Sequence, residues 1–203
     1  ASTRRRTTTA SPARATAATA AMASLAVPAV RAAQARTRPS SRAERLPNVR
    51  LQTHDGREVR FYDDLVRGRL VVLNMMYANC ANICPPNTAN LLRVKEELGS
   101  RVGRDVFMYS LTLQPAIDKP ADLRRYMDKY GIGDGWTFLT GQPRDVELLR
   151  LHLGFYTADP VSDADLKQHT GMVRLGHDAR DRWSMIPAQA TTRQIVDSIK
   201  GYM

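Results

Sequence analysis

Residues 70–86 read Leu-Val-Val-Leu-Asn-Met-Met-Tyr-Ala-Asn-Cys-Ala-Asn-Ile-Cys-Pro-Pro, and this stretch decides the fold. Its first seven residues form a nearly continuous apolar run, which is typical of a central strand buried on both faces of a sheet. Pro85 and Pro86 suit the first turn of a helix, where a missing backbone N–H costs least. We therefore predict a buried strand, a loop with two cysteines and a helix, in that order.

Alternating strand and helix patterns continue on both sides of this stretch. Residues 49–53 and 59–61 alternate apolar and polar side chains, and His54-Asp55-Gly56 between them predicts a hairpin turn. Further on, the apolar periodicity and the boundary residues predict helices over 87–98, 120–130, 143–153 and 190–199, and strands over 106–113, 136–139, 172–175 and 183–186. This order predicts an α/β protein of the thioredoxin-like fold, with a central mixed sheet flanked by helices and an N-terminal hairpin.

Cys80 and Cys84 are the only cysteines, and they lie four residues apart where the strand gives way to the helix. The N–H groups and the dipole of a helix N-terminus stabilise a thiolate, so we expect the pKa of a thiol there to fall. Residues four apart at a helix start are about one turn apart, within the Cα separation of roughly 4.4–6.8 Å that a disulfide tolerates. Both sulfurs can thus face one metal ion or bond to each other. An inert buried pair is the alternative, and the polar neighbours Asn79 and Asn82 argue against it.

The Cys-x-x-x-Cys spacing is one residue wider than the Cys-x-x-Cys of thioredoxins, which leaves room for a metal between the sulfurs. Two soft thiolates suit Cu(I), and an added imidazole allows Cu(II) as well. Zinc also accepts such ligands but usually takes four. A third ligand is to be sought among the histidines, which are His54, His152, His169 and His177.

Residues 47–201 resemble the Sco/SenC family of copper chaperones for cytochrome oxidase. The family hallmark is Cys-x-x-x-Cys-Pro after a hydrophobic strand, which residues 77–85 match, and His169-Thr170 matches a later family histidine that precedes a strand. Leu139-Thr140-Gly141 also matches the family. The segment that carries two acidic residues in the family keeps the second as Asp118, whereas Gln114 replaces the first.

The resemblance implies that Cys80, Cys84 and His169 bind copper, as Cu(I) or Cu(II), and that Asp118 lies near the site. It also implies delivery of copper to the binuclear copper centre of cytochrome c oxidase, or reduction of the cysteines in that centre. The implied partners are the oxidase subunit that holds this centre, another copper carrier and a thioredoxin-like reductant.

The remaining histidines and two methionines have ordinary interpretations. His177 is separated from the predicted ligand by eight residues and a strand, so we do not expect the two to share an ion. We expect His54 to be solvated in its turn and His152 to pack on its helix. Met75 and Met76 offer thioether sulfur, but adjacent strand residues point to opposite faces, which favours core packing.

An enzyme on the same fold is the alternative function. A thiol–disulfide oxidoreductase or a thiol peroxidase needs only Cys80 to attack and Cys84 to resolve. Metal that is lost when His169 is replaced favours the carrier, whereas turnover that survives this replacement favours the enzyme.

The net charge of +10 is concentrated near the N-terminus. Residues 1–50 hold ten arginines and one acidic residue, Glu44, which gives +9. The other 153 residues hold 20 basic and 19 acidic side chains, which gives +1. The body therefore has no basic stripe of the kind that indicates nucleic-acid binding, and nucleic acid is not an expected partner.

Residues 1–35 have the order of a targeting segment. Three arginines, Arg4 to Arg6, precede an alanine-rich apolar run over 17–30, and Ala33-Gln34-Ala35 has the small-x-small pattern of a signal-peptidase site. We expect export to the bacterial periplasm or cell envelope, with the segment near a membrane, and the mitochondrial intermembrane space is the alternative. Residues 36–47 are expected to form a linker, and residues 48–203 the thioredoxin-like domain.

Overall fold

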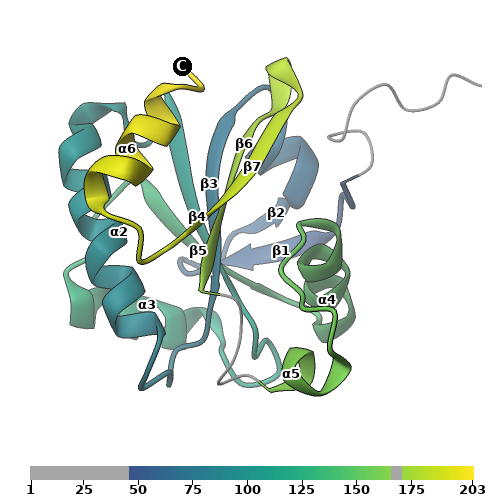
Figure 1. Cartoon of the computed structure of the whole chain (residues 1–203). Helices are drawn as coiled ribbons and strands as arrows, with labels where there is room; N and C mark the ends of the chain where they lie inside the picture. The colour runs from purple at the N-terminus through teal and green to yellow at the C-terminus, as the bar shows by residue number, and fades with distance from the viewer. Residues whose placement is uncertain (1–45, 166–170) are drawn as a thin grey trace, which may run out of the picture. The chain divides into compact units, whose positions relative to one another are not determined.

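The computed structural model describes residues 46–165 and 171–203, in which a seven-stranded sheet carries helices on both of its faces (Figure 1). The strands are β1 (Arg50–Thr53), β2 (Glu58–Arg60), β3 (Leu70–Met76), β4 (Val106–Thr112), β5 (Trp136–Gly141), β6 (Met172–His177) and β7 (Arg182–Pro187). The helices are α2 (Cys84–Leu98), α3 (Pro120–Tyr130), α4 (Pro143–His152), α5 (Pro160–Ala164) and α6 (Thr192–Lys200), with shorter helical turns η2 (Phe61–Val66), η3 (Gly99–Arg101) and η5 (Asp178–Arg180).

The sheet is mixed, with the strand order β2-β1-β5-β4-β3-β6-β7. β3 runs parallel to β4 along its whole length, from Leu70 opposite Val106 to Met76 opposite Thr112. β5 is parallel to β4, whereas β6 is antiparallel to β3 and β1 is antiparallel to β5. The carboxyl ends of β3, β4 and β5 therefore meet at one edge of the sheet, and the cysteine loop leaves from that edge. The predicted mixed sheet with flanking helices and an N-terminal hairpin is confirmed.

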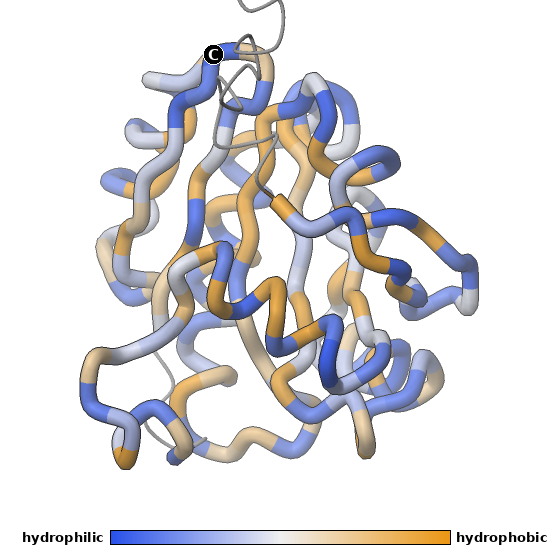
Figure 2. Tube along the Cα trace, turned by 90° about the vertical axis from the view of Figure 1, so that its right-hand side faces the viewer, coloured by the Kyte–Doolittle hydropathy of each residue, from blue (hydrophilic) through white to orange (hydrophobic). Residues whose placement is uncertain are grey.

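Apolar side chains bury both faces of the sheet. Val72 and Met76 of β3 belong to a cluster with α2, α3 and α6, whereas Leu73 and Met75 belong to a second cluster with α4 and η2. Adjacent strand residues point to opposite faces, so one strand supplies both cores. The two methionines are accordingly buried core residues, as expected. Figure 2 shows the same distribution, with hydrophobic stretches along the inner strands and hydrophilic ones towards the outside.

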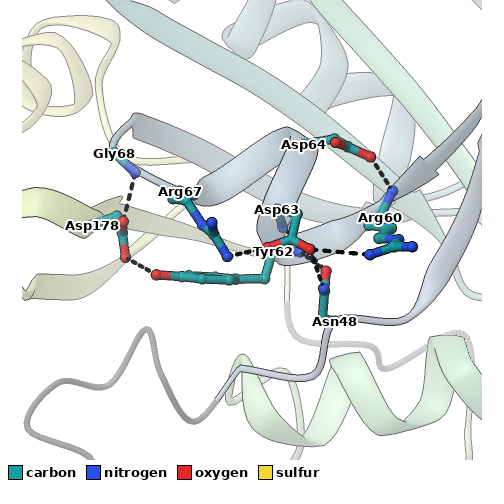
Figure 3. A network of polar contacts seen from close by, with 8 residues as sticks. All are labelled: Asn48, Arg60, Tyr62, Asp63, Asp64, Arg67, Gly68 and Asp178. Carbon is teal, nitrogen blue, oxygen red and sulfur yellow. Dashed lines mark hydrogen bonds and ion pairs between the residues drawn. The ribbon is translucent and has the colours of Figure 1, made fainter.

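Four short helical elements, η2, η3, α5 and η5, were not predicted. η2 is held by side chains from other parts of the chain (Figure 3): the Asn48 side-chain oxygen accepts the N–H groups of Tyr62 and Asp63, each over 3.1 Å. Just beyond its end, the Gly68 N–H donates to the Asp178 carboxylate over 2.6 Å. Because these partners are 14 to 110 residues away in the sequence, no local pattern predicts η2.

Two histidines differ from expectation. His54 is half-buried rather than solvated, because its Nδ1 accepts the Phe138 N–H over 3.2 Å, which fastens the β1–β2 turn to β5. Burial and then the nearby Arg124 charge lower the pKa of His54. His152 is exposed rather than packed, because it lies at the end of α4, where its Nδ1 is 2.8 Å from the Leu148 carbonyl oxygen.

In the described part of the chain, no helix has the length and apolar character needed to cross a membrane. The predicted targeting segment, residues 1–35, and nearly all of the predicted linker lie outside the described residues.

Candidate metal centre

Cys80 and Cys84 lie where the loop after β3 enters α2. The helix begins at Cys84, three residues before the predicted range 87–98, and Pro85 and Pro86 lie in its first turn, as predicted. The Cys84 N–H donates to the Cys80 sulfur over 3.2 Å, and the Cys80 N–H donates to the Tyr77 carbonyl over 3.2 Å. Both cysteines are free thiols, 6% and 2% exposed. The helix start therefore directs a backbone donor at one sulfur while enclosing the other.

The two thiols differ in acidity. Burial opposes ionisation of Cys80, but hydrogen bonds from the Cys84 thiol and N–H, the Tyr77 hydroxyl and the Asn82 N–H outweigh it and lower the pKa of Cys80. Burial, followed by the hydrogen bond to Cys80, raises the pKa of Cys84, and the charge of Asp118 acts in the same direction. Burial and the hydrogen bond to Cys80 also raise the pKa of Tyr77 to about 12. Cys80 is thus the sulfur that becomes a thiolate first.

Asp118 is buried beside the cysteine loop and joins it to the ends of two strands. Its Oδ2 accepts the Ala78 N–H over 2.9 Å and the Thr112 hydroxyl over 2.5 Å. Its backbone carbonyl accepts the Thr140 hydroxyl over 2.8 Å. Its Oδ1 is buried and has no hydrogen-bond partner among the described residues. Asp118 therefore fixes the backbone two residues before Cys80.

The predicted third ligand, His169, falls within residues 166–170, outside the described part of the chain. The chain continues at Gly171, which lies against Ile83: a Cβ added to Gly171 would be 2.8 Å from the Ile83 Cδ1. Among the described residues alone, no group of three or more His, Cys, Asp or Glu side chains could hold a metal ion.

His177 lies at the other end of the sheet. It pairs with Leu70 at the start of β3, whereas the cysteine loop follows the end of this seven-residue strand. At about 3.3 Å per residue, the two ends of β3 are about 20 Å apart. The structure therefore keeps His177 away from the cysteine pair, as expected.

Three side chains that contact Cys80 or Asp118 were not predicted from the sequence as site residues: Tyr77, Thr112 and Thr140. The position of Tyr77, directly after a buried strand, was an available signal. Thr112 and Thr140 belong to the ends of β4 and β5, where parallel strands converge on the edge that carries the cysteine loop. Gln114, which replaces the family's acidic residue, contributes through its backbone: its N–H donates to the Thr112 hydroxyl and its carbonyl accepts the Asp118 N–H.

The donor set fits copper. Two cysteine sulfurs outside any disulfide, four residues apart at a helix start and one of them with a lowered pKa, are the soft ligands that Cu(I) prefers. Two sulfurs alone do not complete the four ligands usual for structural zinc.

Comparison with known proteins gives consistent matches. Residues 39–203 match the SCO1/SenC family model. A SCO1 protein homolog of Bacillus subtilis is 32% identical over 91 residues, which are 44% of this chain and 46% of that relative, so the match spans about half of its length. The structure of Bradyrhizobium japonicum ScoI with copper bound has a TM-score of 0.61 at 19% identity, covering 76% of this chain and 96% of that one. BsSco, a member of the Sco family of cytochrome c oxidase assembly proteins for which a disulfide switch is described, has a TM-score of 0.60 at 24% identity, covering 76% and 90%.

The fold and the site together define a thioredoxin-like protein that presents a cysteine pair at the start of the helix after its central strand. The chain belongs to the SCO1/SenC family, whose model covers most of its length, from residue 39 to residue 203. The family resemblance noted in the sequence is thereby confirmed.

Proposed function

We propose that this chain binds copper through Cys80 and Cys84, with His169 as the third ligand, and carries it to the binuclear copper centre of cytochrome c oxidase. The observation that carries the proposal is the 3.2 Å hydrogen bond from the Cys84 N–H to the Cys80 sulfur at the N-terminus of α2. This bond stabilises a thiolate on Cys80, and thiolates are copper ligands. The copper-bound structure of B. japonicum ScoI, which has the same fold, supports the assignment.

The covalent reach of the chain supports the role of His169. Consecutive Cα atoms are 3.80 Å apart, so the Cα atoms of His169 and Gly171 are separated by at most about 7.6 Å. Gly171 lies against Ile83, which directly precedes Cys84. Because His169 is joined through one residue to Gly171, which lies against the residue before Cys84, it is a candidate ligand, whereas His177 at the far end of β3 is not.

The proposal includes partners and a location. The recipient is the oxidase subunit that holds the binuclear copper centre, another copper carrier loads the pair, and a thioredoxin-like reductant keeps it reduced. Asp118, through its hydrogen bond to the Ala78 N–H, holds the loop in the geometry that both sulfurs need. The proposed location is the bacterial periplasm or cell envelope, from the order of residues 1–35, with the mitochondrial intermembrane space as the alternative.

Reduction of the recipient's cysteines is a second candidate, and the opposite pKa shifts of the two thiols favour it. The Cys80 thiolate attacks one sulfur of a recipient disulfide, forming a mixed disulfide and releasing the other recipient sulfur as a thiolate. Cys84 then loses its proton and attacks the Cys80 sulfur, which forms the Cys80–Cys84 disulfide and releases the second recipient sulfur. Two electrons pass to the recipient, and the reductant returns the pair to its thiol form.

Replacement of either cysteine tests the copper site. Cys80→Ser and Cys84→Ser are each expected to abolish tight Cu(I) binding, because each removes one of two soft ligands. The loss should exceed the roughly 10–100-fold that follows removal of a supporting residue. Titration against a competing Cu(I) chelator measures it, and unchanged affinity in either variant would overturn the assignment.

Replacement of the histidines tests the third ligand. Cu(I) is satisfied by two thiolates, whereas Cu(II) prefers additional ligands such as imidazole. His169→Ala should therefore weaken Cu(II) much more than Cu(I) and remove the thiolate-to-copper charge-transfer colour, while the disulfide still forms. His177→Ala is the matched control and should keep the colour. If His177→Ala loses the charge-transfer colour while His169→Ala keeps it, the ligand assignment is wrong. If neither replacement matters, thiol–disulfide chemistry becomes the better account.

A further inference from the structure

The starts of β3 and β4 border a cleft of about 500 Å³ at the edge of the sheet opposite to the cysteine loop. The seven residues of β3 separate this edge from the cysteine pair by about 20 Å. The cleft can therefore be studied apart from copper binding. Its charged and aromatic lining consists of Arg69, Arg101, Arg104, Asp105, Phe107 and His177, and the rest of the lining has uncharged side chains.

The charges that line this cleft are not balanced within the described part of the chain. Arg104 forms a two-bond ion pair with Asp105, in which its Nε and Nη2 lie 3.0 and 2.9 Å from the two carboxylate oxygens. Arg69 and Arg101 have no carboxylate within ion-pair distance among residues 46–165 and 171–203. The lining thus carries two positive charges without a counter-charge.

Two aromatic residues of β4 hold the guanidinium of Arg69 in place. Its Nη1 donates to the Tyr109 hydroxyl over 3.1 Å, and its central carbon lies 4.6 Å from the centroid of the Phe107 ring. The side chain is half-buried, so it is already ordered before a ligand binds. A guanidinium fixed in this way loses little conformational freedom on binding, and its planar fork suits two oxygens of one phosphate or carboxylate.

Arg101 and His177 complete the polar lining. The Arg101 Nη1 is 2.9 Å from the Met203 sulfur, which is a weak acceptor, and the Met203 backbone oxygen already accepts the Arg180 Nη2 over 2.6 Å. Burial and then the Arg180 charge lower the pKa of His177, so at pH 7 its ring offers a hydrogen bond and no charge. Its Nδ1 is buried and has no hydrogen-bond partner among the described residues. Buried polar atoms are nearly always paired, so an unpaired nitrogen beside this cleft points to a ligand.

A second, larger cleft of about 700 Å³ also contains Arg69 in its lining. Its lining has three acidic side chains, Glu58, Asp63 and Asp64, against the two basic ones of Arg57 and Arg69. This acidic excess repels an anion. An anion that binds Arg69 is therefore favoured in the smaller cleft, where the excess is positive.

We propose that the smaller cleft binds a phosphate monoester. Such an ester carries a charge of about −1.5 to −2 at pH 7, which matches two guanidinium groups, whereas one carboxylate balances only one of them. A volume of about 500 Å³ is in the range of small-molecule sites, so the cleft also accommodates the organic part of the ester, beside Leu70 and Phe107. The inference does not rest on the proposed copper function. A soluble ester and the headgroup of phosphatidic acid share this chemistry.

Titration calorimetry of the full chain with glycerol 3-phosphate tests the proposal. Arg69→Gln and Arg101→Gln each remove one guanidinium and should each weaken binding by about 10-fold or more, the effect of losing a hydrogen bond to a charged group. Arg69→Lys keeps the charge without the fork and should recover only part of the affinity. Arg101 is exposed, so Arg101→Gln tests the cleft even if Arg69→Gln does not fold.

Arg193→Gln is the matched control and should keep full affinity, because Arg193 lies on α6 outside the cleft with a side chain that is 88% exposed. Sodium chloride at equal ionic strength controls for general charge attraction and should give no saturable binding. No binding of glycerol 3-phosphate to the parent protein at either the calorimeter or the vesicles described next would overturn the proposal. So would equal affinity in the parent protein and both glutamine variants of the cleft.

Vesicles of phosphatidylcholine with phosphatidic acid distinguish the two sources of the monoester. Residues 1–50 carry a charge of +9 and attract anionic vesicles by themselves, so the measurement is the difference in co-sedimentation between Arg69→Gln and Arg193→Gln, which have equal net charge. Weaker retention of Arg69→Gln assigns the site to a lipid headgroup. Equal retention, together with saturable binding of glycerol 3-phosphate, assigns it to a soluble ester.

Discussion

The pKa values of Cys80 and Cys84 shift in opposite directions because Cys80 lies just before α2 and Cys84 is its first residue. Cys80 precedes α2 and receives the Cys84 N–H, whereas Cys84 is enclosed in the first turn and only 2% exposed. Hydrogen bonds to the Cys80 sulfur outweigh its burial and lower the pKa of Cys80, whereas burial, the hydrogen bond to Cys80 and the Asp118 charge raise the pKa of Cys84. Under the proposed function, Cys80 meets copper as a thiolate and Cys84 gives up its proton when the metal binds.

The pH dependence of Cys80 alkylation tests this arrangement. The thiolate is the reactive form, so alkylation persists above the Cys80 pKa and is lost as pH falls through it. Tyr77→Phe removes one donor to the thiolate, which raises the pKa and shifts the alkylation midpoint to higher pH. A hydrogen bond to a charged group is worth about 1.5–3 kcal/mol, so an upward shift of about one to two pH units is expected.

Iodoacetamide kinetics between pH 5 and 10, with the Cys80 peptide followed by mass spectrometry, measure this midpoint. Tyr62→Phe is the control, because its hydroxyl faces Asp178 near the other end of β3. Equal midpoints in Tyr77→Phe and the parent protein would show that the Tyr77 hydroxyl does not act on Cys80.

The parts of the candidate site that could be predicted from the sequence are those whose residues lie close together in the chain. The cysteine pair and its helix start lie within a few residues of one another, so spacing and the two prolines were enough. Asp118 lies 38 residues after Cys80, and only the pairing of β3 with β4 brings the two together. The family resemblance indicated Asp118, but nothing in the local pattern indicated its contacts with Ala78, Thr112 and Thr140.

The hairpin of β6 and β7 depends on a glycine in its pairing register. Gly176 is paired with Trp183, and a Cβ added to Gly176 would overlap the ring of that tryptophan. Gly176→Ala should therefore destabilise the protein by about 1–3 kcal/mol, the range for overpacking. Gly133→Ala, with open space around it, should change stability by less than about 1 kcal/mol. Urea unfolding of both variants measures the difference, and matching midpoints would contradict the packing argument.

Elements with local boundary residues were predicted accurately, and elements held by distant side chains were not. α3 runs from Pro120 to Tyr130, the predicted range, because Pro120 and the following Gly131 mark its two ends in the sequence itself. η2 depends on Asn48 and Asp178, which lie far from it in the chain. α5 is only five residues long, too short for a periodic pattern.

At the scale of the whole molecule, the cysteine pair and the residues that support it lie together at one edge of the sheet. The carboxyl ends of β3, β4 and β5 bring together the cysteine loop, Thr112 and Thr140, and Asp118 joins all three. His177 lies at the opposite end of β3. The two buried faces of the sheet hold this edge in place from both sides, which explains how residues far apart in sequence support two sulfurs.

Export with cleavage after Ala35 is the prediction that concerns the whole chain. Residues 1–35 combine three leading arginines, an apolar run and a small-x-small site, the order that signal peptidases recognise. Cleavage removes five arginines and lowers the net charge from +10 to +5, so the mature chain should leave a cation exchanger at lower salt than the full chain. Cell fractionation followed by N-terminal sequencing should find a product that begins at Arg36 in the periplasm. A variant with leucine at positions 33 and 35 is the control and should stay uncleaved.

Export also bears on the cysteine pair. In an oxidising compartment the Cys80–Cys84 disulfide can form, and the proposed reductant would then return the pair to its thiol form. An uncleaved product in the cytosol would contradict both the export and that role.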